Sequence, residues 1–126
     1  MKLYLVRLAK SAIGTLYVPG ITFTTISTVD GKPGINTLTH DEFIAGSASL
    51  EETGFYEEEI HRITETYGSM VNVWSTYEFR IEKNGPVAGR GINGIQLFFD
   101  GTRWWIKSAF WQSESPDIPI PSRYGG

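Results

Sequence analysis

Three stretches near the C-terminal end of the chain decide its fold: Tyr77-Glu78-Phe79-Arg80, Gly89 to Phe99, and Trp104 to Trp111. Aromatic and β-branched residues are frequent in them, and Asp100-Gly101 between the second and the third is a hairpin signal. They predict three consecutive antiparallel strands. Three of the four tryptophans lie on the last strand, so a large aromatic surface must be buried or must meet a partner.

The same pattern extends upstream and predicts a meander of four antiparallel strands. The turn residues Gly68-Ser69 and Asn84-Gly85-Pro86 separate the first three of them. Prolines recur too closely between Ser115 and Pro121 for a helix, which predicts an extended tail over residues 113–126. The expected strands cover Phe55–Tyr67, Met70–Ile81, Arg90–Phe99 and Trp104–Gln112.

A strand and a helix are expected before the meander. Ile21 to Thr28 is rich in β-branched residues and predicts a strand, and the residues from Asp30 to Gly34 supply a turn behind it. Thr39 and Glu42 then match a capping box, in which each residue's side chain accepts a hydrogen bond from the other's backbone amide. We therefore predict a helix from about Thr39 to Glu51, closed near Gly54.

The first residues favour a short helix. Apolar side chains recur there at helical spacing, and Gly14 followed by a Val18-Pro19-Gly20 turn would end the helix. A loose alternation from Lys2 to Arg7 leaves an edge strand as the alternative. The apolar positions are Leu5, Ala9, Ala12, Ile13 and Leu16.

Composition excludes several classes of function. A chain of 126 residues predicts a single domain, and 13% aromatic content is high for a globular protein. The net charge is −3 and the basic residues are scattered singly, so no nucleic acid partner is expected. Thiol chemistry is excluded because the chain has no cysteine. The apolar stretch at the N-terminus is too short and too often charged for a signal core or a membrane span, so we expect a cytoplasmic protein and no membrane partner.

Side chains alternate between the two faces of a strand, so position along each strand sorts the meander residues into two sets. The first set is mainly apolar with isolated polar groups, which is typical of a core-facing surface with a cavity. The second set mixes charges with large aromatics, which is typical of a surface that meets a partner. The first set contains Glu59, His61, Ile63, Val71, Val73, Ser75, Tyr77, Asn93, Ile95, Leu97, Trp104, Ile106, Ser108 and Phe110. The second set contains Ile60, Arg62, Asn72, Trp74, Thr76, Glu78, Gln96, Phe98, Trp105, Lys107 and Trp111.

The segment Gly89-Arg90-Gly91-Ile92-Asn93-Gly94 matches the glycine spacing of dinucleotide-binding loops. That mechanism needs a helix N-terminus directly after the glycines, whereas a strand is expected here. No nucleotide or other cofactor is therefore expected. The glycines instead favour a β-bulge at the start of this strand, which would exchange the faces locally around Asn93.

The order helix, strand, helix and long antiparallel meander resembles the nuclear transport factor 2-like superfamily, and its SnoaL-like branch in particular. The resemblance covers about Val18 to Tyr124. It implies an α+β fold, a cone-shaped barrel in which a curved antiparallel sheet wraps around N-terminal helices and a hydrophobic cavity. It also implies a homodimer formed through the outer face of the sheet. The segments that carry it are Glu59-Ile60-His61-Arg62, Val73 to Glu78, Arg90 to Leu97, Arg103-Trp104-Trp105-Ile106 and Pro116 to Tyr124.

The resemblance implies that residues 1–126 form one SnoaL-like domain, with an N-terminal helical region shorter than is usual in the superfamily. Members that act as ketosteroid isomerases use a carboxylate base, with a tyrosine and a protonated aspartate as oxyanion donors. Counted back from the Asp100-Gly101 turn, Ile95 stands where that aspartate would be. We therefore do not expect chemistry of that kind.

The candidate catalytic residues are His61 and Tyr77. His61 would act as a general base and Tyr77 would donate a hydrogen bond to a developing oxyanion. Glu57 and Glu59 share the expected face with His61, but no second histidine is expected there, so we predict no metal site. The alternative for His61 is an inward polar group that is hydrogen-bonded to Tyr77 or Ser75.

Three functional hypotheses follow from these patterns. The first is a domain with an apolar pocket that binds a small apolar or amphipathic molecule, with no activity assigned. The second is an isomerase, cyclase or dehydratase that uses His61 and Tyr77. The third is a dimeric interaction module. The expected pocket-lining residues are Ile63, Ser75, Asn93, Leu97, Trp104, Ser108 and Phe110. The expected dimer-interface residues are Trp74, Phe98, Trp105 and Trp111.

Overall fold

The computed structural model describes residues 17–126, with side chains at all of these positions except residues 47–53. The helix predicted between Leu5 and Leu16, and its alternative as an edge strand from Lys2 to Arg7, lie outside the described residues.

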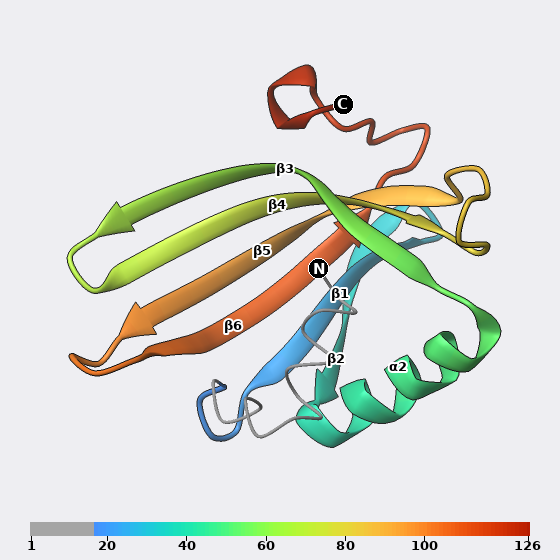
Figure 1. Ribbon diagram of the computed structural model, residues 1–126. Helices are drawn as coiled ribbons and strands as arrows, with labels where there is room; N and C mark the ends of the chain where they lie inside the picture. Colours follow the sequence, from blue (N-terminus) through green and yellow to red (C-terminus); the bar gives the residue numbers. More distant parts are fainter. Residues whose placement is uncertain (1–16) are drawn as a thin grey trace.

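The described residues form a curved six-stranded sheet in the order β2-β1-β6-β5-β4-β3 (Figure 1). The four strands from β3 to β6 form the predicted antiparallel meander. β1 pairs with β2 in the antiparallel direction and with β6 in the parallel direction, so the sheet is mixed and not purely antiparallel. β2 and β3 are its two edges, and the sheet therefore does not close into a barrel. The strands are β1 Thr22–Val29, β2 Lys32–Thr39, β3 Tyr56–Tyr67, β4 Met70–Arg80, β5 Gly89–Phe99 and β6 Trp104–Ser113.

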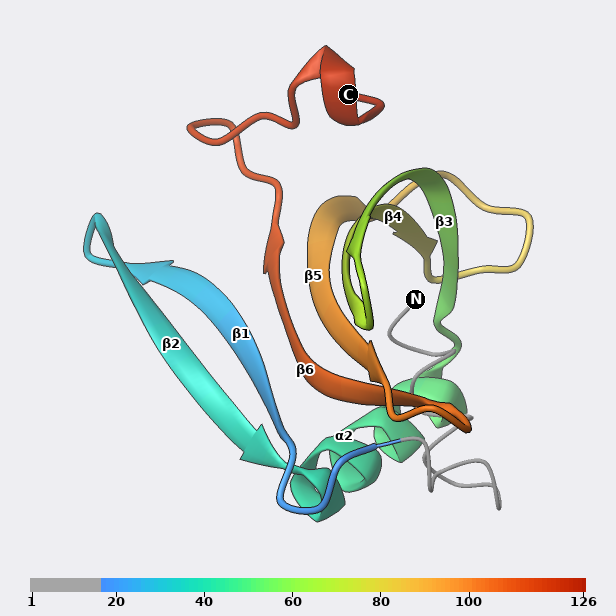
Figure 2. The same cartoon turned by 90° about the vertical axis from the view of Figure 1, so that its left-hand side faces the viewer.

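Strand β2 was not predicted, because Pro33 and Gly34 were assigned to a turn. The turn is in fact confined to Asp30 and Gly31, whose φ angles are 53° and 75°. Positive φ at both central residues produces the tight hairpin that matches the twist of paired strands. β1 and β2 consequently form a hairpin, which splays away from the strongly curved part of the sheet (Figure 2).

Helix α2, His40–Thr53, begins at the predicted capping box. The Thr39 amide donates to Glu42 Oε1 at 3.0 Å, and the Glu42 amide donates to Thr39 Oγ1 at 3.2 Å. These bonds satisfy two backbone donors that a helix start would otherwise leave unpaired. Among the described residues, no helix has the length and apolar character that crossing a bilayer requires.

The core lies between α2 and one face of the sheet, which we call the helix-covered face. Phe43 of α2 stacks on Phe23 of β1, with ring centroids 4.1 Å apart, and its ring lies 5.8 Å from that of Trp111. Burial of such rings is the main favourable term in the stability of a domain of this size. The buried cluster contains Tyr17, Ile21, Phe23, Phe43, Tyr77, Ile95, Ile106, Ala109 and Trp111.

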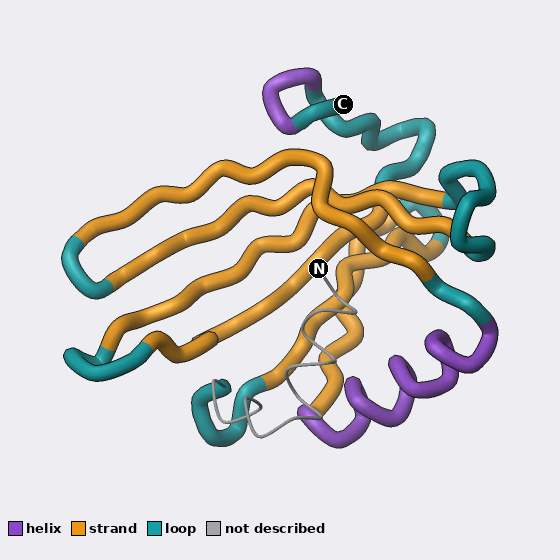
Figure 3. The backbone as a smooth tube through the Cα atoms, viewed as in Figure 1, coloured by secondary structure: helices purple, strands orange, loops and turns teal. Residues whose placement is uncertain are grey.

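The opposite side of the sheet is here called the outer face, and the C-terminal segment reaches it. This segment leaves β6 after Ser113 and runs mostly as irregular chain to the short 3-10 helix Ser122–Tyr124 (Figure 3). The predicted extended tail thus ends in one helical turn. In Figure 1 this segment lies above β3, whereas α2 lies below the sheet.

The turn between β5 and β6 is held by the carboxylate of Asp100. Its Oδ1 accepts hydrogen bonds from the amides of Thr102 and Arg103 at 2.8 and 2.9 Å, and its Oδ2 accepts one from Trp105 Nε1 at 2.7 Å. The Trp105 bond, followed by the two backbone bonds, lowers the pKa of Asp100 to about 2. Each of these bonds favours the ionised carboxylate.

The lowered pKa of Asp100 predicts a stability change in acid. The folded state binds this proton less readily than the unfolded state, so the stabilisation is complete above the unfolded pKa of about 4. It is lost as the pH falls towards the folded value of about 2. Urea unfolding across this pH range should give a steeper loss of stability in the wild type than in Asp100→Asn, which has no carboxylate. Parallel curves for the two proteins would contradict this assignment.

Candidate functional site

A β-bulge in β3 separates the two candidate catalytic residues. Glu59 pairs with Tyr77, but His61 pairs with Thr76, so Ile60 is an extra residue in the strand. Residues that pair across strands share a face, and one extra residue exchanges the faces beyond it. Tyr77 is fully buried on the helix-covered face, whereas His61 lies on the outer face, so the prediction of a shared face was wrong. The two side chains therefore cannot act together on one ligand atom.

His61 lies under the end of the chain. A Cβ atom placed on Gly125 would come within 2.9 Å of His61 Cβ, and the hydroxyl of neighbouring Thr76 donates to the Tyr124 carbonyl at 2.6 Å. The alternative hydrogen bond from His61 to Tyr77 or Ser75 is also wrong, because both partners lie on the opposite face. Ser75 instead donates to Glu59 Oε2.

A second bulge, in β6, exchanges the faces of the last strand. Gln96 pairs with Ser108 and Leu97 pairs with Ile106, which leaves Lys107 as the extra residue. Ser108 and Phe110 were predicted on the core side but lie on the outer face. Trp111 was predicted at a dimer interface but lies on the helix-covered face, where only 9% of it is exposed.

The remaining candidates divide between the two faces as follows. Ile63 pairs with Trp74 and therefore lies on the outer face, contrary to the prediction, because it follows the bulge at Ile60. Ser75, Asn93, Leu97 and Trp104 lie on the predicted helix-covered face. Trp74, Phe98 and Trp105 lie on the predicted outer face.

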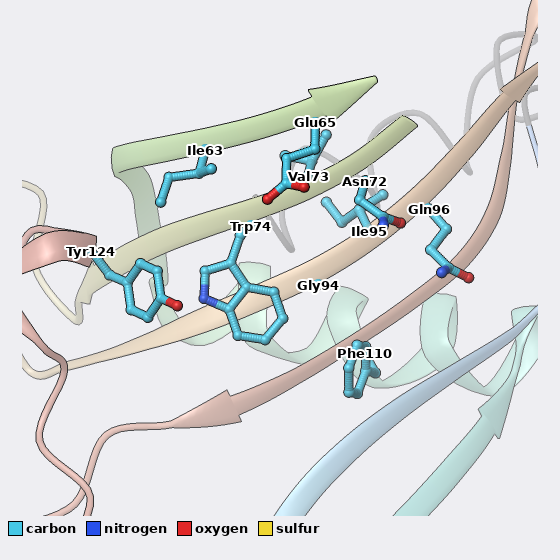
Figure 4. Close-up of a pocket in the computed structure, with 10 residues that line it drawn as sticks. All are labelled: Ile63, Glu65, Asn72, Val73, Trp74, Gly94, Ile95, Gln96, Phe110 and Tyr124. Atoms are coloured by element: carbon cyan, nitrogen blue, oxygen red, sulfur yellow. The ribbon is translucent and has the colours of Figure 1, made fainter. Parts of the chain in front are cut away.

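These exchanges produce an aromatic hollow of about 440 Å³ on the outer face (Figure 4). Trp74 of β4 stands between Phe110 of β6 and Tyr124 of the C-terminal segment (Figure 4). Ile63 of β3 adds an apolar wall. The hollow is lined by Ile63, Glu65, Asn72, Val73, Trp74, Gly94, Ile95, Gln96, Phe110 and Tyr124. We call this site the outer hollow.

Gly94 on β5 allows the rings to meet. A Cβ atom at this position would lie 2.5 Å from Phe110 Cε1 and 3.2 Å from Trp74 Cζ3. Both rings come from its neighbours across the sheet, since Gly94 pairs with Trp74 on one side and with Phe110 on the other. Gly94 is therefore the floor of the outer hollow, and any side chain there would displace the rings.

The C-terminal segment is held in place by Glu114. Its carboxylate accepts two hydrogen bonds from Arg90 at 3.0 and 3.2 Å, and one from the Ile120 amide at 2.7 Å. The Ile120 amide lowers the pKa of Glu114 most, followed by Arg90, while burial opposes them. With Thr76 bound to its carbonyl, Tyr124 thus reaches Trp74, with ring centroids 6.1 Å apart.

Sequence reasoning missed Tyr124 as a site residue. It assigned residues 113–126 to an extended surface segment without a place on the sheet. No motif links Tyr124 to Trp74 in sequence, because their contact depends on where the tail crosses the sheet. The possible signal was the sequence Pro121-Ser122-Arg123-Tyr124, whose proline and aromatic residue suit a segment packed against a surface.

Solved structures share this architecture. A protein of unknown function with a cystatin-like fold from Nostoc punctiforme has a TM-score of 0.62 and 11% identity, covering 95% of this chain and 90% of that one. An NTF2-like protein with a cystatin-like fold from Novosphingobium aromaticivorans has a TM-score of 0.65 and 10% identity, covering 92% of this chain and 77% of that one. The chain has the cystatin-like, NTF2-like fold.

The resemblance to the nuclear transport factor 2-like superfamily is therefore confirmed at the level of the fold. A chain of the yeast complex between the deubiquitinase Ubp3 and the Bre5 cofactor is similar in structure too, with a TM-score of 0.59, 12% identity and 89% coverage of both chains. No protein-family model matches the present chain, and no curated protein matches its sequence. Since one fold can host unrelated functions, function must be inferred from the site.

The helix-covered face of this NTF2-like sheet contains a polar cluster whose inner members, Ser75 and Asn93, are buried. Ser75 and Arg62 donate to the carboxylate of Glu59, and the two Arg62 contacts are 3.1 and 2.8 Å long. Asn93, the register partner of Ser75, is only 1% exposed. Both atoms of its amide are buried without a hydrogen-bond partner in the described part of the chain.

An unpaired buried amide predicts an unusual response to mutation. Asn93→Leu has nearly the same shape and removes two polar atoms, so it should raise the free energy of unfolding by about 1 to 3 kcal/mol. Ser75→Ala is the control, because it deletes a hydroxyl that has a partner and should destabilise. Equilibrium urea unfolding measures both. A less stable Asn93→Leu protein would show that the amide does have a partner, such as a bound molecule.

Proposed function

We propose that the protein binds a small, largely apolar molecule in the outer hollow. The observation that carries this proposal is an aromatic lining formed by three rings from separate elements: Trp74 and Phe110 meet over Gly94, and Tyr124 lies beside Trp74. A volume of about 440 Å³ falls in the range of small-molecule sites, roughly 300 to 1,000 Å³. Such sites combine aromatic walls with a few polar groups, and Asn72 and Gln96 provide amides here.

The exposure of the rings supports the same proposal. Trp74 is 38% exposed and Phe110 is 42% exposed, although both take part in a formed hollow. A ligand seated between them would remove apolar surface from water, which is favourable by about 25 cal/mol per Å². The rings are already positioned by the sheet and by the Glu114 anchor, so binding requires little reordering.

The floor of the outer hollow provides the test. Phenylbutanol, a neutral probe with an apolar body, should shift the Trp74 indole N–H resonance saturably in two-dimensional NMR spectra. Gly94→Val should weaken this binding about tenfold or more, because the added side chain displaces the Phe110 ring. Gly34→Val is the matched control, since a Cβ on Gly34 in strand β2 meets nothing within 4 Å. Equal binding by both variants, or no saturable shift in the wild type, would contradict the proposal.

The outer face also favours a second candidate function, that of a homodimer. Beyond the outer hollow, Phe98 stacks on Trp105 with ring centroids 6.4 Å apart, and Phe98 is exposed together with Met70 and Tyr67. Phe98 pairs with both Met70 and Trp105, and Met70 pairs with Tyr67, so the four residues form one row across four strands. Exposed apolar rows of this kind are typical of protein interfaces.

A homodimer through this row predicts a mass of twice the chain in light scattering coupled to gel filtration. Phe98→Asp should convert the dimer to a monomer, because two unpaired carboxylates would be buried at the interface. Ile35→Asp is the control, since Ile35 is an exposed apolar residue of β2, at the other edge of the sheet. A wild-type monomer, or equal effects of the two substitutions, would exclude the interface.

A further inference from the structure

A polar row borders the aromatic rings of the outer hollow. Glu65, Asn72, Gln96 and Ser108 are successive register partners across β3, β4, β5 and β6. The Ser108 hydroxyl donates a hydrogen bond to Gln96 Oε1 at 2.9 Å, and this bond orients the Gln96 amide. In Figure 4, the side chains of Glu65 and Asn72 both lie above the Trp74 ring, on one side of the hollow. The outer hollow thus has an aromatic half and a polar half.

Among the described residues that line the outer hollow, Glu65 is the only charged one. Two other glutamates of β3 are neutralised by arginines: Glu59 by Arg62 at 2.8 Å, and Glu58 by Arg80 at 3.0 Å. Within the described part of the chain, Glu65 has neither an ion pair nor a hydrogen bond through its side chain. The outer hollow therefore combines exposed π faces with an unpaired negative charge.

We propose that the ligand of the outer hollow is an organic cation, with an ammonium group on an apolar body. This inference rests on the proposed function. Aromatic rings attract cations through the negative charge of their π faces, and Trp is the strongest in this respect. A neighbouring carboxylate adds direct Coulomb attraction. An anion, in contrast, would meet both repulsion from Glu65 and the negative faces of the rings.

Cations of the chain itself show where the ammonium group fits. The guanidinium carbon of Arg123 lies 4.6 Å from the centroid of the Tyr124 ring, so this ring already has a cation. Trp74 has no such contact in the described part of the chain. We therefore assign the ammonium group to the space between Trp74 and Glu65, with the apolar body towards Phe110.

A pair of nearly isosteric probes tests this inference. Phenylbutylamine is protonated at neutral pH, whereas phenylbutanol is neutral and has almost the same shape. Calorimetric titration of the wild type should give an affinity about tenfold higher for the amine, the ratio that corresponds to one cation–π or charge contact of this kind. The preference should shrink in high salt, because Glu65 is exposed and screening weakens its attraction.

Two charge-removing variants separate the role of Glu65 from that of net charge. Glu65→Gln should abolish most of the preference for the amine, because the amine loses a charge contact that phenylbutanol never makes. Glu82→Gln is the matched control, because Glu82 is an exposed glutamate in the loop after β4 and does not line the hollow. It should retain the full preference. Thermal unfolding of each variant checks that the fold is intact.

The outcomes distinguish the two proposals. Equal binding of both probes to the wild type would overturn the cation inference and leave the proposed function standing. Binding of neither probe, including the case in which a second copy of the chain covers the outer hollow, would overturn both. A loss of preference in Glu82→Gln as large as that in Glu65→Gln would also overturn the inference, since the effect would then come from net charge.

Discussion

The alternation of side chains between the two faces of the sheet, with its interruption at two β-bulges, determines the rest of this structure. One extra residue in β3, Ile60, and one in β6, Lys107, exchange the faces of everything beyond them. The bulge in β6 sends Trp111 into the core and Phe110 to the outer face. The bulge in β3 brings Ile63 beside Trp74 and separates His61 from Tyr77. Without these two residues the outer hollow would lose the walls formed by Ile63 and Phe110, and Phe43 would lose its contact with Trp111.

The outer hollow also depends on an absent side chain and on a distant anchor. Gly94 has no Cβ, so two large rings from adjacent strands can converge over its backbone. Tyr124 completes the aromatic wall only because Glu114 holds the start of the tail and Thr76 holds its end. The site therefore combines a rigid part, formed by the sheet, with a part whose position depends on a few hydrogen bonds. The part of the outer hollow formed by Tyr124 of the C-terminal segment should consequently be more adaptable than the part formed by the sheet.

The sequence predicts the elements of this fold well because their ends have local causes. Asp100-Gly101 forms the hairpin turn and the Thr39–Glu42 pair forms the capping box, as expected from residues only a few positions apart. The faces were harder to predict, because Ile60 and Lys107 show no local sign of a bulge. The glycines of β5 suggested a bulge that is absent. Gly89, Gly91 and Gly94 instead make room for the rings of Phe79, Tyr77 and Phe110. A glycine in a strand thus indicated close approach of a neighbour, which the sequence alone does not distinguish from a bulge.

Two glutamates on opposite faces of the sheet, Glu59 and Glu65, differ in their partners, and this difference bears on function. On the helix-covered face, the partly buried Glu59 carboxylate accepts hydrogen bonds from Arg62 and Ser75. On the outer face, Glu65 is exposed to solvent, so leaving its charge unpaired costs little free energy. A charge that stabilises nothing in the folded chain, next to rings that remain exposed, is free to contribute to recognition. If the outer hollow binds a ligand as proposed, its selectivity would arise from the charge of the ligand more than from its shape, because an open hollow constrains shape weakly.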